Sequence, residues 1–383
     1  MTTIPDTGDR PAPWDHLSGA AWRRHPPDGD GPVIGVIGRD VPLELIDAAG
    51  ARPFTLQGDP TLDTTGADHY LGTGLDPAAR SILAVLLDGG LGHLDAIVAC
   101  TDSEGSSRLY YLLRELARVD PGAGVPPLHL VDVLHRRRPS SLRYTTRQVA
   151  GLSRVLAGWT GRPMTDRSLA EAVEERNEVR RHLQAIDALR GELRPRLSGS
   201  DLLTARAASG RLPAAVALPL LAAAVEAVMD GAGPITEPGP VRLLLTGSAH
   251  HEPAVTATIE GAGGAVVADD HPTGALGSGL LCRAPTIQAV AERAWADGGT
   301  PQRASSAERA AATARLASER RVDLVLAYAR RHDEAPLWDA AAQRAALRVP
   351  LVLLPDQGHG AIDRPALTEA LARTRHAIGS NHG

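Results

Sequence analysis

The sequence predicts an α/β fold with two parallel-sheet domains and a helical connector between them. Two stretches, about two hundred residues apart, share one pattern: a short apolar run, a polar loop, a helix and a second apolar run. Short runs that are apolar throughout are typical of strands buried on both faces of a parallel sheet. Each stretch is therefore expected to form a βαβ unit. The repetition favours two domains of related design, although coincidence remains open because βαβ units are common.

The first unit begins with the apolar run Val33–Ile37 and the loop Gly38–Asp40. Pro42 then opens a helix, because the first turn of a helix does not need the N–H that proline lacks. That helix is expected to end at Gly50, and Arg52–Leu56 reads as the next strand. The remaining elements expected in this domain are a helix over Asp76–Leu87, a strand over Leu94–Cys100, a helix over Arg108–Arg118 and a strand over Pro127–Val131.

The second unit begins with the strand Val241–Thr246 and the loop Gly247–Glu252. A helix from Pro253 and a strand over Ala265–Ala268 complete it. Later elements are helices over Pro285–Ala296, Ser305–Arg320 and Pro336–Leu347, strands over Val322–Tyr328 and Val349–Leu354, and a last helix after Pro365. The predicted division is a flexible tail over 1–31, domain 1 over 32–143, a helical connector over 144–238 and domain 2 over 239–383.

Composition excludes several classes of protein. All forty basic residues are arginine, so a Schiff-base lysine, a pyridoxal-phosphate enzyme and a Walker A lysine are excluded. Two cysteines are too few for a multi-thiolate metal centre built from this chain alone. A net charge of −5 without a basic block does not suggest nucleic acid. Without a membrane-length apolar run or a secretory signal, we expect a cytoplasmic protein that binds no membrane.

Four polar loops follow predicted strands, and such loops lie at the carboxyl edge of a parallel sheet, where open α/β folds bind ligands. They are Gly38–Asp40, Cys100–Ser107, Gly247–Glu252 and Arg330–Glu334. If the two domains face each other, these loops converge on one cleft. Cys100, at a strand end before a helix, could have a lowered pKa; the alternative is a buried structural cysteine. His250 and His251 are adjacent and therefore point in different directions, and a lone His332 is more often a surface residue.

The chain also resembles the 2-hydroxyacyl-CoA dehydratase family, which includes the benzoyl-CoA reductase subunits. The segments that carry the resemblance keep the family's order and spacing: Gly35–Pro53, Leu94–Leu113, Asn177–Arg180, Val241–Gly274 and Val322–Gly358. The resemblance implies two flavodoxin-like domains with helical additions. It also implies a two-subunit dehydratase, often a heterodimer of related chains, that removes water from a 2-hydroxyacyl thioester. A [4Fe–4S] cluster on three cysteines and an ATP-dependent activator protein belong to that chemistry.

This sequence departs from the family at the cluster. The three cysteine positions fall on Gly38, on or next to Cys100, and on His332, so only Cys100 is a thiol ligand. One cysteine and one histidine cannot hold a cubane in the family's manner, and we expect the cluster to be absent. The resemblance and the strand-end positions together select the candidate residues. Those for catalysis are Cys100, His332, Asp102 and Glu104, and those for substrate binding are Gly38, Arg39, Ser103, Arg108, His250 and His251.

Three hypotheses about function remain open. In the first, the chain is a subunit that has lost its cluster and pairs with a cluster-bearing relative or with itself. Alternatively, it is a redox-independent lyase in which Cys100, His332, Asp102 and Glu104 share acid–base work. In the third, it binds an acyl-CoA or another small molecule without catalysis.

Overall fold

The residues that the structure describes form two four-stranded sheets whose neighbouring strands all run parallel. The computed structural model describes residues 12–232, 239–274, 279–296 and 300–380. The strands of the first sheet are β1 (Val33–Ile37), β2 (Arg52–Thr55), β3 (Ala96–Cys100) and β4 (Leu128–Val131), in the order β2-β1-β3-β4. Those of the second are β5 (Val241–Gly247), β6 (Gly264–Asp269), β7 (Leu324–Arg330) and β8 (Leu351–Gln357), in the equivalent order β6-β5-β7-β8. The predicted α/β class with parallel sheets is confirmed.

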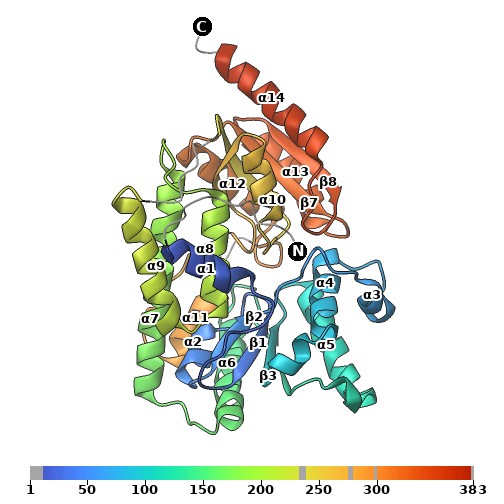
Figure 1. Ribbon diagram of the computed structural model, residues 1–383, viewed down its shortest axis with the longest axis vertical. Coiled ribbons are helices and arrows are strands. Elements are labelled where there is room, and N and C mark those ends of the chain that lie inside the picture. The colour runs from blue at the N-terminus through green and yellow to red at the C-terminus, as the bar shows by residue number, and fades with distance from the viewer. Residues whose placement is uncertain (1–11, 233–238, 275–278, 297–299, 381–383) are drawn as a thin grey trace.

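Helices surround both sheets (Figure 1). Around the first sheet and in the connector they are α1 (Ala12–Trp22), α2 (Leu43–Ala48), α3 (Thr65–Leu71), α4 (Pro77–Leu87), α5 (Glu104–Val119), α6 (Pro139–Thr160), α7 (Asp166–Gly191), α8 (Gly199–Arg211) and α9 (Ala214–Met229). Later in the chain they are α10 (Ala254–Gly261), α11 (Ile287–Ala296), α12 (Ser306–Glu319), α13 (Ala335–Ala346) and α14 (Arg364–Ser380), and two short 3₁₀ turns lie at Gly90–His93 and Pro121–Ala123.

Both faces of the two central strands of the first sheet, β1 and β3, are buried, which explains why these two strands are apolar throughout. Ile34 and Val36 belong to one apolar cluster with Leu152 of α6. Ile37, which points to the other face, belongs to a second cluster with Leu83 of α4. Because successive strand residues point to opposite faces, one five-residue strand contributes to two separate cores.

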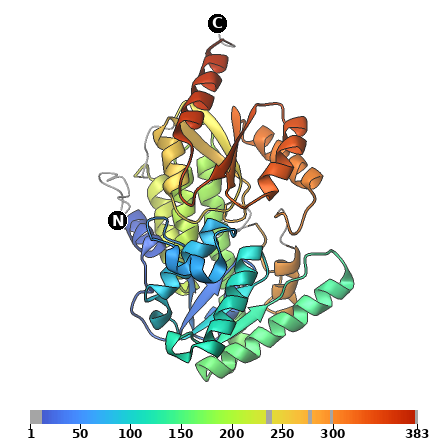
Figure 2. The same cartoon turned by 90° about the vertical axis from the view of Figure 1, so that its right-hand side faces the viewer.

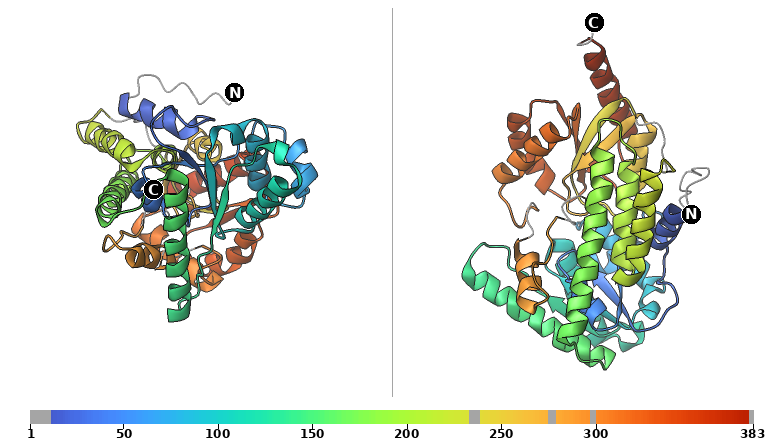
Figure 3. Two further views of the ribbon diagram at one scale, coloured as in Figure 1. Left: turned by 90° about the horizontal axis from the view of Figure 1, so that it is seen from below. Right: turned by 90° about the vertical axis from the view of Figure 1, so that its left-hand side faces the viewer.

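The connector helices touch both sheets and fix how the two domains face each other. Figure 3 shows α7 and α9 running along the side of the molecule. Helix α8 contacts β2 of the first sheet and β6 of the second. Buried ion pairs connect α7 to both domains: Arg176, near the middle of the helix, binds Asp47 of α2 with a shortest N–O distance of 2.5 Å, and Arg190, at its C-terminal end, binds Asp269 of β6 at 2.6 Å. The relative placement of the domains therefore depends on this layer.

The prediction of a flexible segment over residues 1–31 is wrong for residues 12–22, which form α1. Trp14 and Leu17 are fully buried in a cluster with residues of the connector, and α1 packs against α8 and α9. Polar composition alone suggested a loose tail, but two large apolar side chains at helical spacing favour folding against the connector. Residues 1–11 lie outside the described part of the chain.

Two predicted domain limits also need correction. Helix α6, assigned to the connector from residue 144, packs on the first sheet through Val149 and Leu152. Helix α11, assigned to domain 2, crosses back and packs on α6 (Figure 2). Val290 of α11 lies in the same apolar cluster as Val149. Periodicity shows that each helix buries one face, but it does not show against which partner.

Candidate functional site

A cavity of about 830 Å³ lies between the two domains. Its wall includes residues from the loops that follow β1, β3, β5 and β7, which are the four loops selected from the sequence. In each sheet the chain leaves the two central strands in opposite directions, which opens a crevice at their carboxyl ends. The predicted convergence of these loops on one cleft is confirmed, and the volume lies in the range of small-molecule sites.

The structure separates the predicted site residues into two groups. Those that line the cavity are Gly38, Arg39, Asp102, Ser103, Glu104, His251 and His332. Those that do not are Cys100, Arg108 and His250. Arg108 instead lies on the exposed side of α5, where it pairs with Glu104 at 2.7 Å. Helix α5 begins earlier than predicted because the Ser103 hydroxyl accepts the N–H of Ser106 at 3.0 Å, and this start turns Arg108 away from the cavity.

Cys100 is fully buried, and the proposal of a lowered pKa is wrong. Its Sγ accepts the N–H of Asp40 at 3.3 Å and lies 3.5 Å from the Ile37 carbonyl oxygen. Burial, followed by the nearby carboxyl groups of Asp102 and Asp40, raises the pKa of the Cys100 thiol well above its usual value. A neutral thiol shielded from the cavity is a poor nucleophile, so the structural alternative describes this cysteine better.

Gly38, Cys100 and Asp102 form one packed unit at the end of the first sheet. Gly38 has a φ of +87°, and a Cβ at this position would collide with Asp102 Oδ1 and Cys100 Sγ. Asp102 Oδ2 accepts the N–H of Arg39 at 2.8 Å, while its Oδ1 has no hydrogen-bond partner among the described residues. Burial and the neighbouring Asp40 raise the pKa of Asp102. The Asp102 carboxyl therefore fills the volume that a side chain at position 38 would need.

The residues present do not fit a [4Fe–4S] cluster. Position 38 has neither a side chain nor room for one, and the Cys100 thiol is shielded from the cavity. His332, at the third position, lies on the opposite domain with a φ of +64°. In the described part of the chain, no group of three or more His, Cys, Asp or Glu residues is placed to hold a metal ion. A cubane needs several thiolate or imidazole bonds, which this donor set does not supply.

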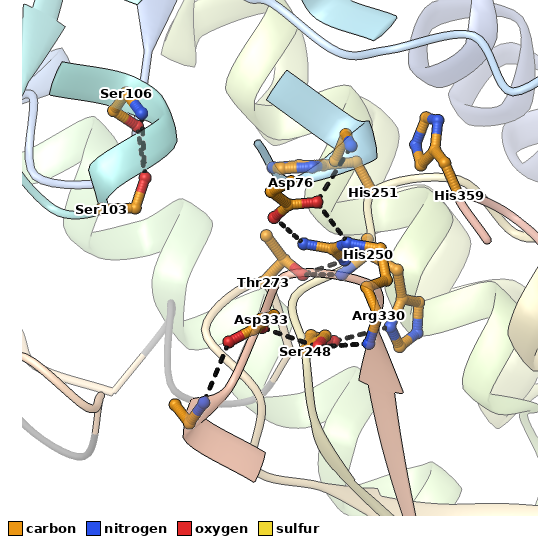
Figure 4. Close-up of polar contacts among 12 residues, drawn as sticks. Asp76, Ser103, Ser106, Ser248, His250, His251, Thr273, Arg330, Asp333 and His359 are labelled. Carbon is orange, nitrogen blue, oxygen red and sulfur yellow. Dashed lines mark hydrogen bonds and ion pairs between the residues drawn. The ribbon is translucent and has the colours of Figure 1, made fainter. Parts of the chain in front are cut away.

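An ion pair joins the two domains at the wall of the cavity. Arg330, at the end of β7, binds Asp76 with Nε–Oδ1 and Nη2–Oδ2 distances of 2.8 and 2.6 Å (Figure 4). The Ser248 hydroxyl accepts the N–H of Arg330 at 2.9 Å and lies 2.6 Å from Asp333 Oδ2. Asp76 also accepts the N–H of Ala78 and so caps α4. One carboxylate thus begins a helix of domain 1 and binds a cation of domain 2.

The two adjacent histidines differ as predicted. The His250 ring is buried, 3.3 Å from both the Ser248 carbonyl oxygen and the Thr256 hydroxyl, and it lies against the His271 ring. The half-buried His251 lines the cavity. Burial lowers the pKa of both imidazoles, that of His251 to about 4. His251 is therefore uncharged near neutral pH.

A second polar wall belongs to domain 2 and was not predicted from the sequence. Asp270 follows β6, and its Oδ2 lies 2.5 Å from the Thr313 hydroxyl. Gln343 Nε2 donates to Thr313 and to Thr246 at 3.2 and 3.3 Å. Burial raises the pKa of Asp270 to about 6. All four residues line the cavity.

Sequence reasoning therefore missed Asp76, Ser248 and Asp270. Asp270 ends an apolar run, Ser248 lies in a strand-end loop, and Asp76 precedes a proline as helix-capping residues do. Those signals mark the carboxyl edge of the sheets. They do not reveal which side chains meet across the cleft.

The fold and the cleft define an α/β protein with two parallel-sheet domains and a cavity between them. A sequence profile of the family described as 2-hydroxyglutaryl-CoA dehydratase, D-component, matches residues 40–348. The chain therefore belongs to this family, as the resemblance indicated. No curated protein sequence is a significant match to the chain. Within the described ranges, no helix has both the length and the apolar character required to cross a bilayer.

Proposed function

We propose that this chain is a cluster-less subunit of a 2-hydroxyacyl-CoA dehydratase, and that it binds an acyl thioester in the interdomain cavity. A related subunit that carries the cluster is its proposed partner, and an ATP-dependent activator would serve that partner. The main support is the contrast between an open cavity with a complete set of strand-end loops and a cluster position closed by Asp102. This contrast supports a scaffold that keeps a ligand-binding cavity without a cluster.

The cavity wall supports binding of a molecule with both apolar and polar parts. Leu43, Leu56 and Leu203 contribute apolar surface from domain 1 and the connector, whereas Thr246 and Gln343 contribute polar groups from domain 2. An acyl thioester combines an apolar chain with carbonyl and hydroxyl groups, which matches such a wall.

The test is to purify the protein without oxygen, alone and coexpressed with a cysteine-complete relative, and to measure iron, acid-labile sulfide and acyl-CoA binding. The expected result is no iron on the lone chain, iron and sulfide in the complex, and saturable acyl-CoA binding by the lone chain. Iron and sulfide in equal amounts on the lone chain would overturn the proposal, as would the absence of both a complex and acyl-CoA binding.

A second candidate is a redox-independent lyase on the same scaffold. Asp102 and Asp270 favour it, because both carboxyl groups line the cavity and burial raises the pKa of each. Carboxyl groups with raised pKa values can transfer protons near neutral pH. Turnover of a 2-hydroxyacyl-CoA in air by the lone chain, lost in Asp102→Asn and Asp270→Asn, would favour this candidate. Binding without turnover would favour the subunit role.

A further inference from the structure

The imidazole of His251 occupies an unusual position in the cavity wall. It lies in the loop between β5 and α10, and its backbone N–H donates to Oε2 of Glu252 at 3.1 Å. Its ring makes no hydrogen bond to any residue that the structure describes, although it lines the cavity. The neighbouring His250 ring contacts polar atoms of the protein through both nitrogens. Of the two rings, only that of His251 is left to meet a ligand.

The surroundings of His251 keep its ring uncharged. Burial is the largest effect, and the positive Arg330 and the nearby His359 and His250 act in the same direction. Glu252 opposes them, but its carboxylate is also engaged by His359, whose Nε2 lies 3.4 Å from Oε2. An uncharged imidazole offers one N–H donor and one acceptor nitrogen.

We propose that His251 recognises the uncharged polar end of the bound thioester, through hydrogen bonds to its carbonyl or hydroxyl oxygen. This inference rests on the proposed function, because it assumes that a thioester enters the cavity. A carbonyl oxygen needs a donor, and a hydroxyl group can use a donor and an acceptor together. The anionic parts of a ligand would instead favour the arginines of the wall, which include Arg39, Arg206, Arg309 and Arg330. His251 therefore selects a neutral, oxygen-bearing group.

The experiment measures the affinities of three probes: 2-hydroxybutyryl-CoA, butyryl-CoA and S-butyl-CoA, a thioether that lacks the carbonyl. The variants are His251→Phe, which removes both ring hydrogen bonds, and His251→Gln, which restores an uncharged donor and acceptor. His69→Gln on α3, outside the cavity, is the matched control. We expect His251→Phe to weaken the two thioesters about tenfold and the thioether little, whereas His251→Gln and His69→Gln retain binding. Thermal unfolding verifies that each variant is folded.

The outcomes separate this inference from the function on which it rests. If the wild-type protein binds no probe, the proposed function and the inference both fail. If the wild-type protein binds the thioesters and His251→Phe binds all three probes equally well, only the inference is overturned. If His251 acted through a charged imidazole, His251→Arg would retain binding better than His251→Gln. That result would also overturn the inference.

Discussion

Arg330 and Asp76, which are 254 residues apart in sequence, form a two-point ion pair across the interdomain cleft. The Arg330 side chain is only 5% exposed, so loss of Asp76 leaves a buried guanidinium without its direct ion-pair partner. The pair therefore links the stability of the chain to the relative position of its two domains.

Asp76→Asn tests this link. The amide keeps the shape of the side chain and an oxygen that can cap α4, but it removes the negative charge. Breaking a buried pair costs about 3–5 kcal/mol, and we expect a marked fall in the temperature of thermal unfolding. Asp88→Asn, which breaks the exposed pair with Arg24, is the matched control and should cost less than about 1 kcal/mol. Equal falls in the unfolding temperature of the two variants would show that the Asp76–Arg330 pair does not stabilise the contact between the domains.

Gly74→Trp tests whether the cavity is the ligand site. A Cβ at Gly74 would meet no atom within 4 Å, and Gly74 lies at the cavity wall. We expect the indole to obstruct ligand entry and to weaken acyl-CoA binding by at least about tenfold, with little change in thermal stability. Gly66→Trp, at an equally open position outside the cavity, should leave the affinity unchanged. Titration calorimetry of both variants makes the comparison.

The buried carboxyl group of Glu260 is expected to make the free energy of unfolding depend on pH. This carboxyl accepts the N–H of Gly199 and the hydroxyl hydrogen of Ser200, both at 2.6 Å, and burial raises its pKa to about 7. The pKa of Glu260 is therefore higher in the folded than in the unfolded state. The stabilisation that the protonated carboxyl provides is complete below about pH 4.5 and is lost as pH rises through 7. Glu260→Gln should reduce the fall in unfolding free energy between pH 5 and 8. The exposed Glu171→Gln is the control, and equal pH profiles for wild type and Glu260→Gln would contradict the prediction.

Asp102 is predicted to shield Cys100. In a Cys282→Ser background, the Cys100 thiol of the native protein should react with a disulfide reagent only after unfolding, because it is fully buried. Asp102→Ala opens space beside Cys100 Sγ and should accelerate the reaction under native conditions. Asp120→Ala, a surface change at the end of α5, serves as the control. No acceleration in Asp102→Ala would mean that the backbone alone protects the thiol.

Local patterns were sufficient to predict the two sheets. The runs Val33–Ile37 and Val241–Thr246 are short and almost wholly apolar, as expected of buried strands rather than surface helices, and both are strands that are largely buried. The position of each polar loop followed from the strand before it, because parallel strands place their carboxyl ends at one edge. The residues that line a cleft at that edge could therefore be selected in part.

Contacts between distant elements could not be predicted in the same way. No residue near Arg330 in the sequence indicates that its side chain pairs with Asp76. Likewise, no residue near Cys100 indicates that its thiol points into the core rather than into the cavity. The apolar face of α11 predicts burial, but its partner α6 is set by the path of the whole chain. Such pairings depend on three-dimensional packing, for which one sequence contains no local signal.

The return of α11 to α6 has a consequence for synthesis on the ribosome. Val149 and Leu152 of α6 emerge more than a hundred residues before Val290, which packs in the same cluster. Because nascent chains fold as they emerge, the N-terminal half remains with part of its apolar surface exposed while the connector and β5–β6 are translated. A truncated gene that ends after the first sheet would therefore encode an aggregation-prone fragment, and co-translational chaperones have a defined interval in which to bind it.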